Sequence, residues 1–295
     1  MKLHMSRNRS FLRPLISSLF CHFATPHFRC FVTSFSLCLV VILAGCRKNE
    51  SDNFIDLPVV EAYLSPGHPI TVRVSQKVPY DENTTAPSRD LDALGVTIGY
   101  AGQEYPLAVM GNGIYRDTAG RIPVMTDSTY TLRLTYNNTR VTSSTCIPSK
   151  PKSVSQSVTS ITLSQIDPDD PPAPGQFTPV TISFANADES NYLATIECID
   201  TTLVPVYKDS IPDIDMFSSH PVTGTEIEIR PQSIRYFGLN RIILYHINPE
   251  YRVFFLRQQN TSQSYQDPPT NVANGLGIFT GVNADTLYLN VIQSK

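Results

Sequence analysis

Side chains that could do chemistry are few in this sequence and lie far apart. After residue 45 the histidines are His68, His220 and His246, and no two of them have the spacing of a metal site such as HExxH. The sequence also has no CxxC, no Gly-x-Ser-x-Gly nucleophile turn and no phosphate-binding P-loop. His246 stands alone in the apolar stretch RIILYHIN and is expected to be a structural residue. We therefore predict no catalytic residue, no metal and no cofactor, and a protein that is not an enzyme.

Two further stretches resemble ligand sites only superficially. Asp167, Asp169 and Asp170 could offer oxygen ligands to calcium, but they lack the Asp-x-Asp-x-Asp-Gly pattern and its distal glutamate. A solvated loop is the favoured interpretation. The glycines of residues 275–281 have the wrong spacing for a dinucleotide site. They are better explained as a turn and a strand in which glycine allows positive φ or close backbone approach.

Cys46 is the residue with the clearest predicted chemistry. Residues 1–45 carry five basic residues and no acidic one, and residues 31–44 are uncharged. This apolar run is shorter than the roughly 20 residues of a membrane-spanning helix, so it favours a secretory signal peptide. The residues that follow, Leu-Ala-Gly-Cys at 43–46, resemble the bacterial lipobox. We predict a lipoprotein signal peptide over 1–45, lipidation of Cys46 and a lipidated tether over 46–56; the alternative is an uncleaved anchor with an ordinary thiol.

Removal of the leader would make the protein acidic. Residues 1–45 hold five of the 23 basic residues and none of the 26 acidic ones, so the remainder would have a net charge of −8. Such a chain, without a basic run, is a poor partner for nucleic acid or for an anionic lipid surface. Besides Cys46, only Cys146 and Cys198 would remain. The sequence leaves open whether these two form a disulfide or stay separate thiols.

Short alternating stretches predict a mainly β fold. In TYTLRLTY (129–136), tyrosine and leucine would point to one face and threonine and arginine to the other. Asn137-Asn138 then suits a tight two-residue turn, so residues 129–147 are predicted to form a hairpin. Turn signals recur about every ten residues between 57 and 149. This region is predicted to be an immunoglobulin-like β-sandwich domain.

A second β-rich domain is predicted over residues 154–295, with one helix at about 249–262. Asn248 is a suitable N-cap, Pro249 suits the first helical position, and Glu250 suits the first turn. Tyr251, Phe254 and Phe255 follow at helical spacing and are expected to pack onto the sheet of this domain. Two insertions, 166–177 and 208–221, are predicted to be irregular and are candidate contact elements.

Several stretches together resemble a family of lipoproteins from Bacteroidota, the domain of unknown function 4249. They are VVEAYLSPGHPITVRVSQ (59–76), the Tyr-x-Leu-x-Leu before the Asn-Asn turn, STCIP (144–148), ESNYLATIE (189–197), PEYRVFFLRQQ (249–259) and NVANGLGIFTG (271–281). The Pro-rich residues 168–174 depart from the family pattern. The resemblance implies a lipid-anchored cell-envelope protein, expected in the outer membrane and associated with a TonB-dependent receptor.

Five Asp-Ser or Asp-Thr pairs resemble the O-glycosylation acceptor of Bacteroidota. The candidate sites are Thr118, Ser128, Thr201, Ser210 and Thr286. The alternative is that these pairs simply favour turns, since Asp, Ser and Thr side chains bond to nearby backbone.

Two functions from different classes are consistent with these sequence features. The leading one is a non-enzymatic accessory partner of a TonB-dependent receptor in uptake, held at the membrane by lipid. The alternative is a surface lipoprotein that binds a glycan or peptide directly. The chain has no tryptophan, so tyrosines in or near loops, Tyr80, Tyr207 and Tyr265, are the candidate sugar platforms.

Overall fold

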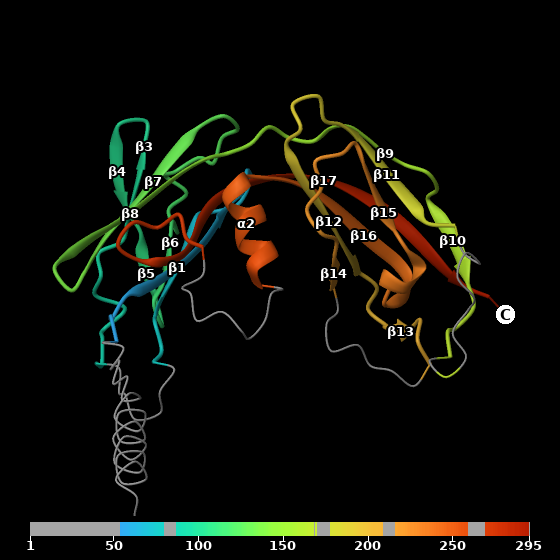
Figure 1. The fold of residues 1–295 in the computed structure, drawn as a ribbon, viewed down its shortest axis with the longest axis horizontal. Helices are drawn as coiled ribbons and strands as arrows, with labels where there is room; N and C mark the ends of the chain where they lie inside the picture. The colour runs from blue at the N-terminus through green and yellow to red at the C-terminus, as the bar shows by residue number, and fades with distance from the viewer. Residues whose placement is uncertain are drawn as a thin grey trace, which may run out of the picture. The chain divides into compact units, whose positions relative to one another are not determined.

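A computed structural model describes residues 54–79, 87–167, 169, 178–208, 216–258 and 269–294. In this part of the chain the protein is mainly β with one α-helix, as Figure 1 shows, which confirms the predicted fold class. Residues 54–295 form one compact unit.

The N-terminal part of this unit is a β-sandwich. One of its layers contains β1 (Pro58–Leu64), β2 (Thr71–Gln76), β6 (Ile114–Arg116) and β5 (Ala108–Gly111), hydrogen-bonded in that order. The other layer contains β4 (Gln103–Pro106), β3 (Thr97–Tyr100), β7 (Thr129–Tyr136) and β8 (Thr139–Cys146). Alternate residues of both layers are buried in a shared core, as the sequence alternation predicted.

The predicted hairpin is confirmed residue by residue. Strands β7 and β8 pair from Thr129 with Cys146 to Tyr136 with Thr139. Asn137 and Asn138 have φ values of 50° and 60°, as a two-residue turn with both central residues left-handed requires.

The C-terminal part contains a larger set of strands. Its long strands are β12 (Asn191–Cys198), β16 (Tyr236–Ile247) and β17 (Leu276–Gln293), with the short β14 (Met216–Ser218), β10 (Ser160–Leu163) and β13 (Val204–Pro205) beside them. A separate sheet contains β15 (Glu226–Ile229), β11 (Val180–Ala185) and β9 (Lys152–Gln156). A short 3-10 helix, η1, spans Pro231–Ser233. The second core lies between these two sheets.

Two segments without a predicted strand contain one. Lys152 and Ser153, which fall between the two predicted domains, are the first residues of β9. The insertion 208–221 includes β14, which pairs with β12 from Ser218 with Thr195 to Met216 with Glu197. Three residues are too few for alternation to reveal a strand, so only the pairing partner makes it recognisable.

Strand β17 connects the two parts. Its first residues pair in parallel with β1, from Leu276 with Val59 to Gly281 with Leu64, and its later residues pair antiparallel with β16. Phe279 of β17 is fully buried in the first core, whereas Leu289 further along is fully buried in the second. One strand therefore contributes to both cores and crosses from one predicted domain into the other.

Glycines make this crossing possible. Gly277 has a φ of 91°, and a Cβ there would lie 2.0 Å from the carbonyl oxygen of Val60. A Cβ at Gly281 would lie 2.6 Å from the carbonyl oxygen of Cys146. Both positions therefore require the absence of a side chain, as predicted for this glycine-rich stretch.

The helix, α2 (Pro249–Gln258), begins where it was predicted to begin. The end predicted for it, near residue 262, lies outside the described residues. Tyr251 packs beside a small third core of Leu193, Ile247 and Val282, on the outer face of the large sheet. Tyr251 also makes an edge-to-face contact with Tyr63 of β1, with the ring centroids 5.7 Å apart. Tyr251 thus packs against both halves of the sheet.

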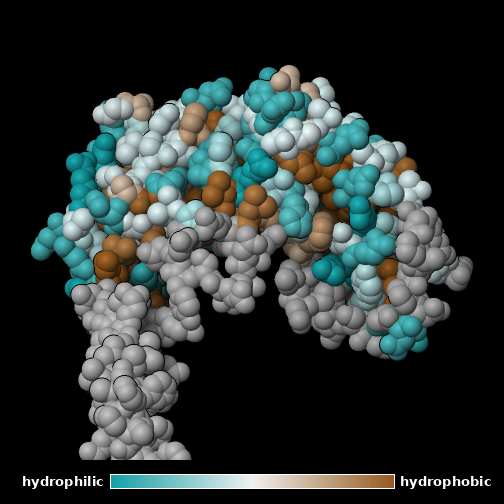
Figure 2. All heavy atoms as spheres, in the orientation of Figure 1, coloured by the Kyte–Doolittle hydropathy of each residue, from teal (hydrophilic) through white to brown (hydrophobic). Residues whose placement is uncertain are grey.

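On the face in view in Figure 2, apolar residues lie in groups between hydrophilic ones. Several large apolar side chains are more than a third exposed, among them Met216, Tyr288 and Ile292 on the outer face of the C-terminal sheet.

Candidate functional site

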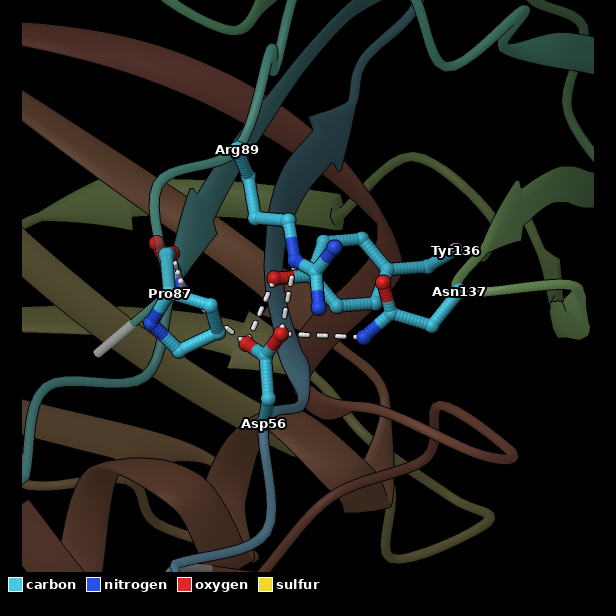
Figure 3. Close-up of polar contacts among 6 residues, drawn as sticks. Asp56, Pro87, Arg89, Tyr136 and Asn137 are labelled. Carbon is cyan, nitrogen blue, oxygen red and sulfur yellow. Dashed lines mark hydrogen bonds and ion pairs between the residues drawn. The ribbon is translucent and has the colours of Figure 1, made fainter.

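The candidate site lies where the predicted tether meets the folded body. Asp56 precedes β1 by two residues and stands ten residues after Cys46. It is surrounded by Gln76 at the end of β2, by Arg89, and by Tyr136 and Asn137 at the β7–β8 turn (Figure 3). We refer to these five residues as the Asp56 cluster.

The Asp56 carboxylate accepts four side-chain hydrogen bonds. Its Oδ1 accepts from Gln76 Nε2 at 2.9 Å and from the Tyr136 hydroxyl at 2.7 Å. Its Oδ2 accepts from Arg89 Nε at 2.8 Å and from Asn137 Nδ2 at 2.9 Å. The side chain is 11% exposed. Charge-assisted hydrogen bonds of this length are stronger than neutral ones, so the cluster holds the segment before β1 against β2, Arg89 and the β7–β8 turn.

Secondary contacts brace the cluster. Gln76 Nε2 also donates to the carbonyl oxygen of Pro87 at 2.8 Å, which holds the 87–89 segment beside β2. The Arg89 guanidinium lies 6.0 Å from the centroid of the Tyr136 ring, within the range of a cation–π contact. The backbone N–H of Lys77 donates to the carbonyl oxygen of Leu57 at 3.1 Å.

The protonation behaviour of the cluster follows from these contacts. Burial raises the pKa of Asp56, but the hydrogen bonds from its four neighbours outweigh that effect and lower the pKa to about 2. Burial, together with the hydrogen bond to Asp56, raises the pKa of Tyr136 to about 12. At neutral pH the pair is therefore a carboxylate and a neutral phenol. Every oxygen of the carboxylate is engaged, which suits a structural connection rather than a general base.

A second polar cluster fixes the start of α2. Glu250 Oε1 accepts hydrogen bonds from the hydroxyls of Thr280 at 3.0 Å and Thr145 at 3.3 Å. Asn248 Nδ2 donates to Thr145 Oγ1 at 3.0 Å and to the carbonyl oxygen of Cys146 at 2.9 Å. These contacts connect α2 to β8 and β17. Asn248 thus directs its amide to β8, a contact that the N-cap prediction did not include.

A pocket of about 170 Å³ lies beside this cluster. Small-molecule clefts usually hold roughly 300–1,000 Å³, so this pocket is small for a drug-sized ligand. Its lining comes from α2, β17 and residues 269–271: Glu250, Val253, Phe254, Pro269, Thr270, Asn271, Gly277 and Ile278.

The predicted modification sites are scattered rather than gathered. Cys46 and Ser210 lie outside the described residues. Thr118 and Thr201 are exposed in a turn and a bend, Ser128 is half-buried, and Thr286 is exposed within β17. Glycosylation at these positions stays a prediction.

The aspartates that precede these residues have structural contacts. Asp117 Oδ2 accepts from the backbone N–H of Ile122 at 2.8 Å, and Asp200 Oδ2 accepts from the N–H of Leu239 at 3.0 Å. The Asp117 contact is local, as the turn-forming alternative expects, whereas the Asp200 contact joins β16 across 39 residues of sequence.

The histidines have structural surroundings. His246 is buried, stacks on Tyr192 with centroids 4.6 Å apart, and donates from Nδ1 to the carbonyl oxygen of Ser149 at 2.8 Å. His220 makes an edge contact with Phe255 of α2, with centroids 6.2 Å apart. Across the described ranges, no group of three or more His, Cys, Asp or Glu side chains could hold a metal ion.

The structure describes both cysteines and one of the three tyrosines that the sequence analysis singled out. Cys146 is an exposed free thiol and Cys198 a half-buried one, and burial raises the pKa of Cys198. Tyr80 and Tyr265 lie outside the described residues. Tyr207 is half-buried against the second core and donates its hydroxyl to the carbonyl oxygen of Gln232 at 3.2 Å, so its ring is a poor sugar platform.

Sequence reasoning missed the Asp56 cluster entirely. Asp56 was assigned to the tether, and its partners stand 20 to 81 residues away. The only local signal is an acidic residue directly before the first alternating strand, which is common in loops and carries no specific meaning.

Comparisons with known proteins bear on family membership. Within the described residues, no helix has the length and apolar character needed to cross a membrane. The comparison with curated proteins returned no match. A family model described as "Domain of unknown function (DUF4249)" matches residues 49–287, which include the Asp56 cluster, the first core and most of the second core and of β17. The chain belongs to this family.

Proposed function

We propose that this protein is a non-enzymatic lipoprotein of the cell envelope, anchored at the outer membrane through Cys46. The observation that carries the proposal is the sequence Leu-Ala-Gly-Cys at the end of an uncharged run, ten residues before Asp56. Ten extended residues span at most about 35 Å. Because the Asp56 cluster fixes the end of this tether to the sandwich, the body would stay close to the membrane surface.

A body held so near the membrane is suited to a partner embedded in it. The resemblance to envelope lipoproteins points to a TonB-dependent receptor, with this protein as an accessory in uptake. Such a role needs a rigid body and a short tether rather than a catalytic site.

The anchor is tested by Cys46→Ser in the native host. The variant should leave the membrane fraction or retain its leader, whereas Cys146→Ser, the control at an exposed thiol, should behave as the unmodified protein. A Cys46→Ser protein that is cleaved and still fully membrane-bound would refute the proposal.

The partner is tested separately by purification of the full chain from native membranes in mild detergent. A TonB-dependent receptor should co-purify in stoichiometric amounts. Repeated recovery of the lipoprotein alone would leave the anchor intact but would overturn the accessory role.

A second candidate function is direct binding of a glycan or peptide. The observation that favours it is Tyr288, a tyrosine 52% exposed on an open sheet face rather than in a loop. A ligand at 100-fold over its dissociation constant should stabilise the protein by roughly 2.7 kcal/mol, which a thermal-shift measurement detects.

A further inference from the structure

The strands β14, β12, β16 and β17 share an outer face, which we call the outer sheet face. In each strand alternate residues point into the second core, and the intervening ones point outward. The register places Glu197, Arg241 and Tyr288 side by side across β12, β16 and β17. Met216 of β14 continues this row beyond Glu197.

Tyr288 lies on this face with polar groups around it. Its cross-strand neighbour is Arg241, and Thr286 and Asn290 stand two residues before and after it on the same side of β17. Tyr288 is 52% exposed, and Thr286 and Asn290 are both exposed. An accessible aromatic ring beside hydroxyl, amide and guanidinium groups, with the exposed Leu239 and Ile292 on the same face, can stack on an apolar surface and hydrogen-bond at its rim.

The charged groups of the face are already paired. Arg241 Nε donates to Glu197 Oε1 at 2.9 Å, and a second guanidinium nitrogen of Arg241 contacts the same oxygen. By the alternation of the four strands, no other side chain of Asp, Glu, Lys or Arg points outward from their paired, described residues. The guanidinium is thus held in place beside Tyr288, and the face carries no net charge.

The size and charge of the face favour one class of occupant. The accessible part of the face is shorter than the strands, because β14 has three residues and Leu193, Thr195 and Ile247 at one end of the same face are buried. A stable interface between globular proteins needs about 800 Å² from each partner, so the face is small for one. An extended peptide would gain most from the backbone groups of a strand edge, which a sheet face does not offer. An uncharged chain with alternating apolar faces and hydroxyl groups fits better.

We propose that the outer sheet face binds an uncharged oligosaccharide, with a sugar ring stacked on Tyr288. Arg241, positioned by Glu197, would hydrogen-bond to the hydroxyls of that sugar, together with Thr286 and Asn290. This inference rests on the second candidate function and not on the accessory role, which is tested by co-purification.

The test is titration calorimetry on the full chain, purified in a detergent without a sugar head group. The probes are maltoheptaose, cellohexaose and xylohexaose, with a galacturonic acid oligomer as the charged comparison. At least one uncharged probe should bind more tightly than the charged one. Tyr288→Ala should weaken that binding by about tenfold or more, because the stacking surface is removed.

Two variants make the result specific. Tyr288→Phe keeps the ring and should bind within about threefold of the unmodified protein. Met125→Ala changes a side chain that is also 52% exposed but lies outside this face, and it should bind normally. The proposal is overturned if none of the uncharged probes binds, if Tyr288→Ala binds as well as Met125→Ala, or if Tyr288→Ala abolishes only the binding of a protein partner.

Discussion

Asp56 joins three segments of the sandwich through one carboxylate, and its pKa shift makes the contribution measurable. The pKa falls from an ordinary 3.8 to about 2, so the ionised form is favoured in the folded protein. Its contribution to stability is therefore complete above about pH 4 and is lost as the pH falls through about 2. We expect Asp56→Asn to lower the free energy of unfolding by about 1–2 kcal/mol at pH 7 and by progressively less below pH 4.

Urea unfolding between pH 7 and pH 3 measures this effect. Glu189→Gln removes an exposed carboxylate and serves as the control, with a change of less than about 0.5 kcal/mol expected. An Asp56→Asn deficit that stays the same at every pH would show that the carboxylate charge is not what the cluster uses.

At the residue scale, local geometry could be predicted and distant partnerships could not. The Asn137-Asn138 turn depends on residues next to each other, and it forms as expected. The partners of Asp56 come from three separate segments of the chain, and composition and alternation contain no information about which segments meet. Tyr288 was passed over for the same reason, because its exposure depends on which strands surround it.

At the element scale, β17 depends on a glycine. An alanine at Gly277 would place its Cβ 2.0 Å from the carbonyl oxygen of Val60 and would adopt a left-handed φ of 91°. Either β1 or β17 must then shift, which breaks their parallel pairing. We expect Gly277→Ala to cost about 3 kcal/mol or more in the free energy of unfolding.

The matched control is Gly224→Ala. A Cβ at Gly224 meets no atom within 4 Å, so this variant should change the stability by less than about 0.5 kcal/mol. Denaturant unfolding measures the free energy of unfolding of both variants. Equal values would mean that β1 and β17 tolerate a shift at this point.

The sequence predicted some elements and pairings but not others. The β7–β8 hairpin and the start of α2 follow from alternation, turn residues and a proline at the first helical position. The parallel pairing of β1 with β17 joins segments more than 200 residues apart. No periodic pattern encodes such a pairing, although the glycines required by it were visible.

At the scale of the whole molecule, the predicted glycosylation sites are spread over the surface, and one of them, Thr286, also belongs to the proposed ligand site. Thr118, Thr201 and Thr286 are exposed, so three of the predicted acceptors are accessible. We expect the intact mass from the native host to show a glycan series above the lipid-modified mass, reduced stepwise by Thr118→Val and Thr201→Val. A lipid-modified mass without any sugar would contradict this.

Thr286 is an exception among these acceptors. It borders Tyr288 on the outer sheet face, so a glycan attached there would cover the ring. Glycosylation of Thr286 and binding of an oligosaccharide at Tyr288 therefore exclude each other. A glycan found on Thr286 by peptide mapping of the native protein would rule out binding at Tyr288 in the host.

The shared strand predicts how the whole body unfolds. Phe279 and Leu289 are both fully buried in β17, one in each core. Loss of either core removes partners of the same strand, so residues 54–295 should unfold in one cooperative transition. Phe279→Ala should cost about 3–5 kcal/mol and Leu289→Ala about 2–5 kcal/mol, and each should shift that single transition as a whole. Calorimetry tests this by comparing the measured and van't Hoff enthalpies. Two separate transitions, with each variant lowering only one of them, would mean that the cores are independent despite sharing β17.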